Sequence, residues 1–220
     1  MGPSELIASA VVPPNPDLRC AVCRKPNDGM ISLVASETET DRLRVLSVCV
    51  GNICRSPVSE FLLRHELGDR VDSTSAGTHA LVGDPVYPPM AVRLDGLGVA
   101  HQGGARQVTE PMLRQSDLIL TMTRDLRSRV VELAPATVRR TFTLAEFAAI
   151  VAAGVRPSAP PSGRSELVSL IAAAAAQRSA VAGRGAELDI ADPYRRDDAD
   201  YGLAFDQIRR CVSAIRAAWD

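Results

Sequence analysis

Cys49 and Arg55 are separated by five residues in the segment VCVGNICRSP, and their types and spacing suggest chemistry. A cysteine thiolate is a strong nucleophile, and an arginine guanidinium offers two parallel donors to two oxygens of one phosphate group. Ser56 follows the arginine and can donate its hydroxyl to a thiolate. These residues therefore predict a loop that binds a phosphate group and attacks it with sulfur.

The residues around this pair predict a strand that ends at the loop and a helix that begins after it. Residues 44–50 are an apolar strand candidate, and Ser56 with Pro57 is a helix start with the serine as N-cap. Backbone N–H groups at such a junction point at a bound anion, and we expect Gly51 to supply a conformation that a side chain would obstruct. A helix N-terminus and a guanidinium lower the pKa of a thiol to roughly 3.5 to 7.5, which predicts a thiolate at Cys49.

A lone cysteine–arginine spacing has another explanation. Cys49 and Cys54 would then be small buried residues at a strand end, as free cysteines often are. The bare spacing is common by chance. Here the strand, the glycine, the arginine and the helix start stand in register, and this combination favours the nucleophilic role.

Cleavage of a phosphate ester also needs an acid that protonates the leaving oxygen. Two Asp-Pro pairs compete for that role, Asp84 with Pro85 and Asp192 with Pro193. In both pairs the proline biases the aspartate towards an extended conformation, which fixes the direction of the carboxylate. The residues alone leave both candidates open.

The composition favours an ordinary globular protein. The chain has 220 residues, 46% of them hydrophobic, and 25 basic against 26 acidic residues give a net charge of −1. Such a balance gives no long-range attraction to nucleic acid or to an anionic membrane, so we expect neither as a partner. No apolar run approaches the roughly 20 residues of a membrane span, and residues 1–12 do not resemble a signal peptide, which predicts a cytoplasmic protein.

The cysteine count indicates reduced thiols. Five cysteines are an odd number in a chain without an export signal, and a disulfide framework would use an even number. Cys20 and Cys23 form half of a possible zinc knuckle, but no second pair of ligands accompanies them. Zinc binding by this pair stays as a weak alternative, and for the phosphate chemistry we expect no metal and no cofactor.

Short apolar segments alternate with helical patterns after residue 42, which is typical of a parallel sheet with helices on both faces. The strand candidates are residues 44–50, 71–78, 117–122 and 141–144, and the helical patterns are residues 57–68, 89–97, 124–133, 144–153 and 201–219. We interpret residues 1–42 as a poorly ordered extension and residues 43–220 as the main domain. An alanine-rich helical insertion is predicted within it, at about residues 154–185.

The segment from Val48 to Pro57 resembles the signature of the low-molecular-weight protein tyrosine phosphatases almost residue for residue. Further similar segments are VDSTSAGT at 71–78, ARQ at 105–107, SDLILTM at 116–122 and TFTLAEF at 141–147, so the resemblance covers about residues 43–153 and 186–219. It implies an α/β fold of three layers, with a four-stranded parallel sheet and the phosphate loop between the first strand and the first helix. It also implies hydrolysis of phosphotyrosine in protein substrates through a cysteinyl-phosphate, without a cofactor, in a bacterial tyrosine kinase pathway.

The resemblance also assigns roles to residues. The family places its acid in an Asp-Pro-Tyr loop before the last helix, which makes Asp192 the acid beside Cys49 and Arg55. Cys54 would form a reversible disulfide with Cys49 that protects the nucleophile from further oxidation. The other implied residues bind phosphate or support the loop (Val50, Gly51, Asn52, Ile53, Cys54, Ser56 and Ser75) or line the substrate cleft (Leu81, Asp84, Tyr194 and Arg195).

Two features depart from the family pattern. The histidine that helps to brace the loop asparagine, here Asn52, corresponds to Gly103, and His101 lies two residues further upstream. In the cleft wall, Leu81 stands where many relatives carry an aromatic residue, and Arg195 stands where Tyr or Gly is common. These departures concern the support of the loop and the substrate preference.

Two other activities on the same scaffold remain as alternatives. An arsenate reductase needs two further cysteines as a relay, and only Cys211 lies downstream, on the apolar face of the last helical pattern. Protein arginine phosphatases carry threonine where this chain has Ile53, and this difference favours phosphotyrosine.

Overall fold

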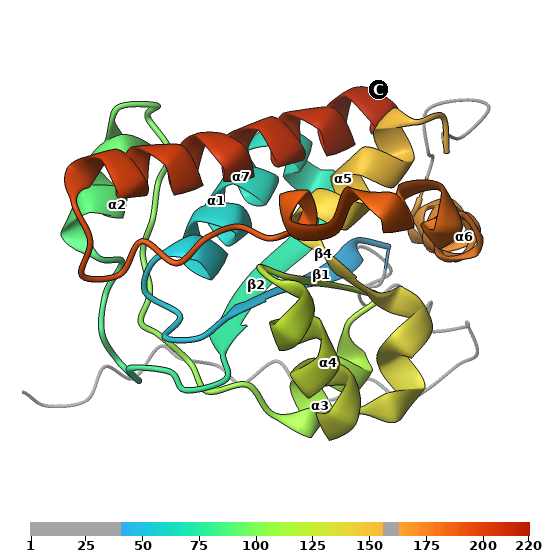
Figure 1. Cartoon of the computed structure of the whole chain (residues 1–220), viewed down its shortest axis with the longest axis horizontal. Coiled ribbons are helices and arrows are strands. Elements are labelled where there is room, and N and C mark those ends of the chain that lie inside the picture. The colour runs from blue at the N-terminus through green and yellow to red at the C-terminus, as the bar shows by residue number, and fades with distance from the viewer. Residues whose placement is uncertain (1–40, 156–162) are drawn as a thin grey trace, which may run out of the picture. The chain divides into compact units, whose positions relative to one another are not determined.

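Four parallel strands form the sheet that carries the cysteine–arginine loop (Figure 1). The computed structural model describes residues 41–155 and 163–220. The strands are β1 Leu43–Cys49, β2 Val71–Gly77, β3 Leu118–Thr121 and β4 Thr141–Thr143, in the spatial order β2-β1-β3-β4. β1 pairs with β2 along its whole length, so Cys49 and Gly77 lie side by side at the carboxyl ends of their strands.

Helices cover both faces of this sheet (Figure 1). They are α1 Arg55–Leu67, η1 Gly68–Arg70, α2 Pro88–Asp95, α3 Glu110–Gln115, α4 Arg124–Leu133, η2 Pro135–Arg140, α5 Leu144–Ala152, α6 Arg164–Ala176, η3 Arg178–Leu188 and α7 Asp198–Trp219. α1, α5 and α7 lie on one face, and α3 and α4 lie on the other.

Side chains of β1 alternate between two apolar layers, as the pleat of a strand requires. Leu43 and Val45 point into the larger layer, under α1, α5 and α7, whereas Leu46 and Val48 point into the smaller layer, under α3 and α4. All four side chains are buried, so β1 is fixed from both sides. The rigid strand holds the start of the loop in place.

The predicted fold class is confirmed, because the sheet is parallel, has four strands and is covered by helices on both faces. One α-helix was not predicted: α3 has six residues, too few to show a period, and the Thr109 hydroxyl caps it by accepting from the amide of Met112. α7 begins at Asp198, earlier than predicted, because Asp197 caps it by accepting from the amide of Asp200.

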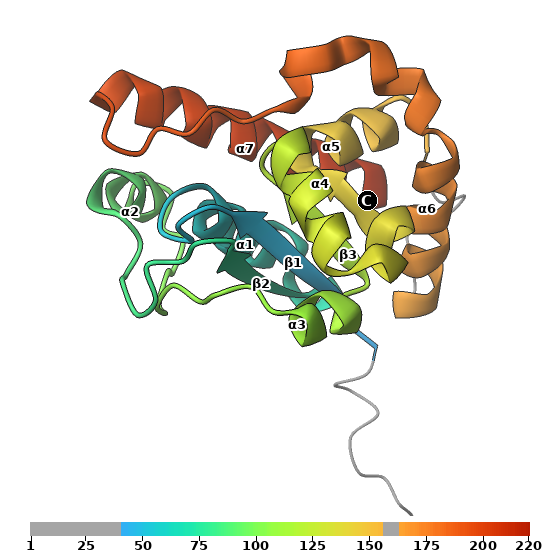
Figure 2. The ribbon, with the colours of Figure 1, turned by 60° about the horizontal axis from the view of Figure 1, so that its bottom comes forward.

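The alanine-rich stretch forms α6 and η3 (Figure 2). α6 buries Leu167, Leu170 and Ile171, and it contacts η2, α5 and β1. Residues 156–162 of the predicted insertion lie outside the described residues, as do residues 1–40 of the predicted extension with the Cys20 and Cys23 pair.

Two further observations concern residues 41–155 and 163–220. Within these ranges no helix has the length and apolar character needed to cross a membrane. In the same part of the chain, no group of three or more His, Cys, Asp or Glu side chains is arranged to hold a metal ion.

Candidate active site

The loop of residues 50–54 lies at the carboxyl end of β1, between β1 and α1 (Figure 1). The chain passes from β1 to β2 on one side and then to β3 on the other side, so the strand order reverses at β1. Crevices at such reversals are the usual ligand sites of open parallel sheets. The topology therefore places the loop where a ligand is expected.

Hydrogen bonds from outside orient the peptide groups of the loop. The carbonyls of residues 49–51 accept from the N–H groups of residues 78, 79 and 81. Because the C=O and N–H of one planar peptide group point in opposite directions, the amides that follow these carbonyls face the inside of the loop. The amide of Asn52 is one of them, and it donates to Sγ of Cys49 at 3.2 Å.

Asn52 makes the tightest turn of the loop. Its φ of 57° lies in the left-handed region, which residues other than glycine rarely adopt. Its side chain is held at both ends: Oδ1 accepts from the amide of Arg106 at 2.7 Å, and Nδ2 donates to the hydroxyls of Ser75 at 2.8 Å and Ser56 at 2.9 Å. These bonds stabilise a conformation that is unfavourable by itself.

A glycine is required at residue 77 and not at residue 51. A Cβ atom on Gly51 would meet only the side chain of Ile53, at an ordinary 3.6 Å, and the φ of Gly51 is not positive. A Cβ atom on Gly77 would overlap the carbonyl oxygen of Val50 and lie 3.0 Å from the amide nitrogen of Asn52. The prediction that Gly51 supplies the unusual conformation is therefore wrong, because Asn52 adopts it and Gly77 leaves room for it.

Gly77→Ala is expected to displace the loop and to weaken phosphate binding at least about tenfold, because small misplacements of a binding group are costly. Strand β2 cannot move away without losing its pairing with β1. Titration calorimetry with inorganic phosphate would measure the change. Gly202→Ala in α7 is the control, since its Cβ would lie 3.5 Å from the guanidinium of Arg93 and touch nothing in the loop. Equal phosphate affinity in both variants would contradict the prediction.

Cys49 ends β1 with its sulfur facing two donors. They are the amide of Asn52 at 3.2 Å and the hydroxyl of Ser56 at 3.0 Å, and both stabilise negative charge on the sulfur. Ser56 is not the N-cap that the sequence suggested. Cys54 occupies the N-cap position and α1 begins at Arg55, without a capping bond from a side chain, so the Ser56 hydroxyl lies within the first turn and faces the sulfur.

Arg55 and Asp192, which are 137 residues apart in the sequence, form an ion pair. Only 3% of Arg55 is exposed, and its Nη1 donates to the carbonyl of Ile190 at 3.0 Å. The carboxylate of Asp192 is 44% exposed and also accepts from the amide of Tyr194 at 3.2 Å. Nε of Arg55 has no partner among the described residues, so this guanidinium keeps a donor for a ligand.

Cys54 is buried beside this pair, and its thiol is held in the neutral form. Burial raises the pKa of Cys54 to about 12, the charges of Cys49 and Asp192 act in the same direction, and Arg55 acts against them. A thiol with so high a pKa is a poor nucleophile and reacts slowly with oxidants. The two cysteines of the loop are therefore chemically unequal.

A cavity of about 320 Å³ opens over the loop. It is lined by Cys49, Val50, Gly51, Ile53, Cys54, Arg55, His79, Leu81, Asp192, Tyr194 and Arg195. Tyr194 contacts Tyr87 edge-on at 5.5 Å between ring centres, and the guanidinium of Arg195 lies over the Tyr194 ring at 5.2 Å. One wall of this cavity is thus an aromatic ring with a cation on it.

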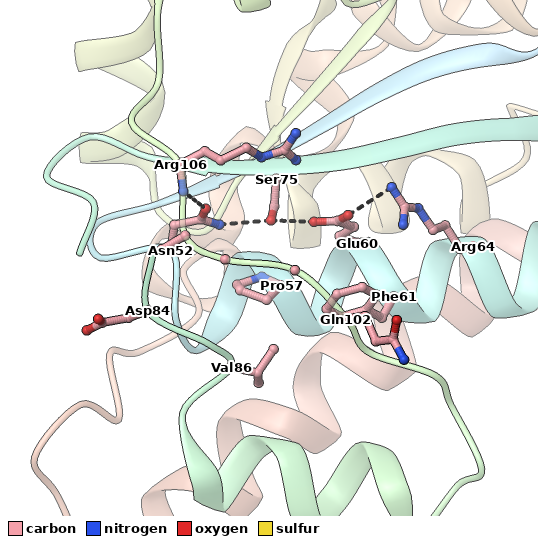
Figure 3. Close-up of a pocket in the computed structure, with 13 residues that line it drawn as sticks. Asn52, Pro57, Glu60, Phe61, Arg64, Ser75, Asp84, Val86, Gln102 and Arg106 are labelled. Carbon is pink, nitrogen blue, oxygen red and sulfur yellow. Dashed lines mark hydrogen bonds and ion pairs between the residues drawn. The ribbon is translucent and has the colours of Figure 1, made fainter. Parts of the chain in front are cut away.

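Asp84 does not line this cavity, which contradicts its predicted place in the substrate cleft. It lines a second cavity, of about 230 Å³, which shares no lining residue with the first (Figure 3). Its amide donates to the carbonyl of Leu81 and its carbonyl accepts from the amide of Ala105. These backbone bonds fix Asp84 in the wall of the second cavity.

His101 does not brace Asn52. Its Nε2 lies 2.9 Å from the carboxylate of Asp95, and its ring packs against Phe61. The residue that sequence reasoning missed is Glu60, which accepts from the Ser75 hydroxyl at 2.5 Å (Figure 3). No sequence pattern pointed to Glu60, because an acidic residue on a helix is usually exposed.

Comparisons with known proteins show which proteins this chain is similar to. Residues 44–157 match the model of the low molecular weight phosphotyrosine protein phosphatases. The low molecular weight protein-tyrosine-phosphatase Etp of Escherichia coli is 44% identical over 92 residues, which are 41% of this chain and 62% of Etp. The probable low molecular weight protein-tyrosine-phosphatase EpsP of Ralstonia nicotianae is 30% identical over 176 residues, which are 77% of this chain and 91% of EpsP.

A solved structure shares the fold. The YwlE arginine phosphatase from Geobacillus stearothermophilus superposes with a TM-score of 0.60 at 24% identity, over 80% of this chain and 91% of that structure. The family model and EpsP together show that the chain belongs to the low molecular weight phosphotyrosine protein phosphatase family.

Proposed function

We propose that this chain hydrolyses phosphotyrosine in protein substrates through a cysteinyl-phosphate intermediate. The observation that carries the proposal is the convergence on one cavity of the Cys49 sulfur, the loop amides, Arg55 and Asp192. An anion-binding loop alone would explain phosphate binding. The acid beside the arginine adds what is needed to release a phenol.

A phosphate group would enter the ring of inward-facing amides at residues 50–52. Arg55 would then exchange its carboxylate partner for two phosphate oxygens, a geometry that a guanidinium matches and an ammonium does not. Its unpartnered Nε supports this exchange, because that nitrogen has no bond to lose. Asp192 would be released towards the leaving oxygen, and its exposed position permits this movement.

The reaction would proceed in two displacements. In the first, the Cys49 thiolate attacks phosphorus, the bond from phosphorus to the phenolic oxygen breaks, and Asp192 gives that oxygen its proton. In the second, the Asp192 carboxylate takes a proton from water, the water oxygen attacks phosphorus, and the thiolate leaves. Arg55 and the loop amides would hold the three equatorial oxygens in both steps.

The walls of the cavity favour an aryl phosphate. Ile53, Leu81 and Tyr194 would enclose a flat ring between apolar side chains, and the names of the relatives Etp and EpsP support phosphotyrosine. The partner would be a protein phosphorylated by a tyrosine kinase. We also propose a cytoplasmic location, because a free thiol nucleophile needs a reducing compartment. Residues 43–220 would form the phosphatase domain, with α6 and η3 as its insertion.

Two peptides of the same sequence test the substrate class, one with phosphotyrosine and one with phosphoarginine. We expect kcat/KM for phosphotyrosine to be at least about tenfold higher, because Ile53, Leu81 and Tyr194 would pack against an aromatic ring and gain less from a guanidinium. A preference for phosphoarginine would identify an arginine phosphatase instead. Turnover of neither peptide would overturn the proposal.

The protective role of Cys54 gives a redox prediction. Peroxide would oxidise Cys49 to a sulfenic acid, and the Cys54 thiol would lose its proton and attack that sulfur to form a disulfide and water. Because both cysteines line the same cavity, their nearness would offset the high pKa of Cys54. In Cys54→Ser, peroxide would oxidise the sulfenic acid further to a sulfinic acid, which thiols do not reduce. Wild-type enzyme should therefore recover activity with a thiol reductant, whereas Cys54→Ser should remain inactive after the same exposure. Cys211→Ser is the control, because Cys211 lies on α7, outside the cavity over Cys49. Equal recovery of the wild type and Cys54→Ser would contradict the role.

A further inference from the structure

Glu60 is a buried carboxylate behind the loop that the proposed mechanism does not use. It lies on α1, it is 6% exposed, and it lines the second cavity and not the cavity over Cys49 (Figure 3). Its Oε2 accepts from the Ser75 hydroxyl at 2.5 Å, and its Oε1 lies 2.9 Å from Nη2 of Arg64. A buried carboxylate with this few partners needs an explanation.

The hydrogen bonds between Glu60 and the loop have fixed directions. Oδ1 of Asn52 accepts from the amide of Arg106, so Nδ2 of Asn52 must be the donor to the hydroxyl of Ser75. Glu60 as a carboxylate only accepts, so Ser75 must donate to it. The hydrogen bonds therefore run in one direction: Asn52 donates to Ser75, and Ser75 donates to Glu60.

The side-chain nitrogen of Asn52 also connects this series of hydrogen bonds to the nucleophile. Nδ2 of Asn52 also donates to the hydroxyl of Ser56 at 2.9 Å, and Ser56 donates its own proton to Sγ of Cys49 at 3.0 Å. Without Glu60, the Ser75 hydroxyl would lose its acceptor and could turn to donate to other groups. Asn52 would then lose the partner that fixes its amide, and its left-handed backbone would lose support.

No side chain stands between Glu60 and Ser75. Residues 102–106 pass the second cavity, and Gly103 and Gly104 bring no side chain into it (Figure 3). Phe61 and Val86 supply apolar walls, and Glu60 and Ser75 are only 6% and 3% exposed, so the hydrogen bond between them is little exposed to competing water. A hydrogen bond to a charged acceptor is strong in such surroundings.

We propose that Glu60 is a positioning residue: through Ser75 it fixes Asn52, and through Asn52 and Ser56 it fixes the sulfur of Cys49. The effect of Glu60 on turnover rests on the proposed function. Its effect on the loop itself does not, because phosphate binding and thiol alkylation report on loop geometry without any catalytic step.

Three variants separate the hydrogen bond from the packing and the ion pair. Glu60→Leu removes the acceptor and keeps the volume, Glu60→Gln keeps an acceptor oxygen, and Arg64→Met removes the ion pair but leaves Ser75 its acceptor. We expect Glu60→Leu to slow alkylation of Cys49 by iodoacetate and to weaken inorganic phosphate binding, each about 10- to 100-fold. Glu60→Gln and Arg64→Met should stay within about threefold of the wild type, as substitutions that spare the key contact do.

A double-mutant cycle tests whether Glu60 acts through Ser75. Residues that act in series give a double variant no worse than the worse single variant, so Glu60→Leu with Ser75→Ala should match Ser75→Ala alone. Multiplied effects in the double variant would overturn the proposal, as would an Arg64→Met defect as large as that of Glu60→Leu.

If Glu60→Leu does not fold, Ser75→Ala still tests the proposal. Unchanged alkylation of Cys49 and unchanged phosphate binding in Ser75→Ala would also overturn the proposal. If the wild type alkylates at Cys49 and binds phosphate but does not turn over an aryl phosphate, only the phosphatase function is contradicted.

Discussion

Cys49→Ser is expected to reduce turnover of an aryl phosphate by at least about 10⁴-fold, as removal of a catalytic nucleophile does. The Asn52 amide and the Ser56 hydroxyl are aimed at a sulfur anion, and a neutral serine hydroxyl would gain little from them. The loop amides and Arg55 do not depend on the sulfur. Inorganic phosphate should therefore still bind, within about threefold of the wild-type affinity. Steady-state kinetics and calorimetry on the same preparation would measure both quantities.

Cys211→Ser is the matched control for this substitution. Cys211 lies on α7 and lines neither the cavity over the loop nor the second cavity, so its replacement should leave turnover unchanged. Turnover in Cys49→Ser close to that of the wild type would remove Cys49 as the nucleophile. Loss of both turnover and phosphate binding would indicate that the loop has collapsed, and Cys49→Ala would then be needed to measure binding.

The sequence was sufficient for those parts of the site that are built from neighbouring residues. β1, the loop and α1 are contiguous, and the apolar run, the arginine and the helix start all agree on their boundaries. Strands β2, β3 and β4 follow the same local logic, since each is a short segment between helices. The parallel sheet then follows from the alternation of strands and helices.

The support of the loop could not be predicted in this way, because it depends on which distant residues come close. Gly51 was expected to be the special glycine from its place in the loop, yet the constraint falls on Gly77, which β-pairing puts beside Cys49. Glu60 meets Ser75 only because α1 packs on β2. Each of these contacts joins elements that are separate in the sequence, so no local sequence pattern predicts them.

The choice between the two Asp-Pro pairs also depends on tertiary contacts. Both aspartates have the same local chemistry, so the residues alone could not separate them. In the structure, Asp192 forms an ion pair with Arg55, whereas Asp84 is turned towards residue 105 and lines the second cavity. The ion pair also means that a phosphate competes with Asp192 for the same guanidinium.

Asp192→Ala is therefore expected to have two opposite effects. Turnover of phenyl phosphate should fall about 10²- to 10⁴-fold, because the leaving phenolate would lack its proton donor. Turnover of an activated ester such as 2,4-dinitrophenyl phosphate should fall far less, since that leaving group needs little protonation. Inorganic phosphate should bind more tightly, because Arg55 would no longer be paired with a carboxylate. Steady-state kinetics with both esters and calorimetry with phosphate measure these effects.

Asp84→Ala is the matched control for the acid, because it removes the same group from the other Asp-Pro pair. It should change neither the dependence on the leaving group nor phosphate affinity, since Asp84 lies outside the cavity over Cys49. If Asp84→Ala instead slowed phenyl phosphate and spared the dinitrophenyl ester, the acid would be Asp84. Weaker phosphate binding in Asp192→Ala would show that the ion pair prepares Arg55 for the anion, whereas tighter binding shows that Asp192 must leave Arg55 before it can serve as the acid.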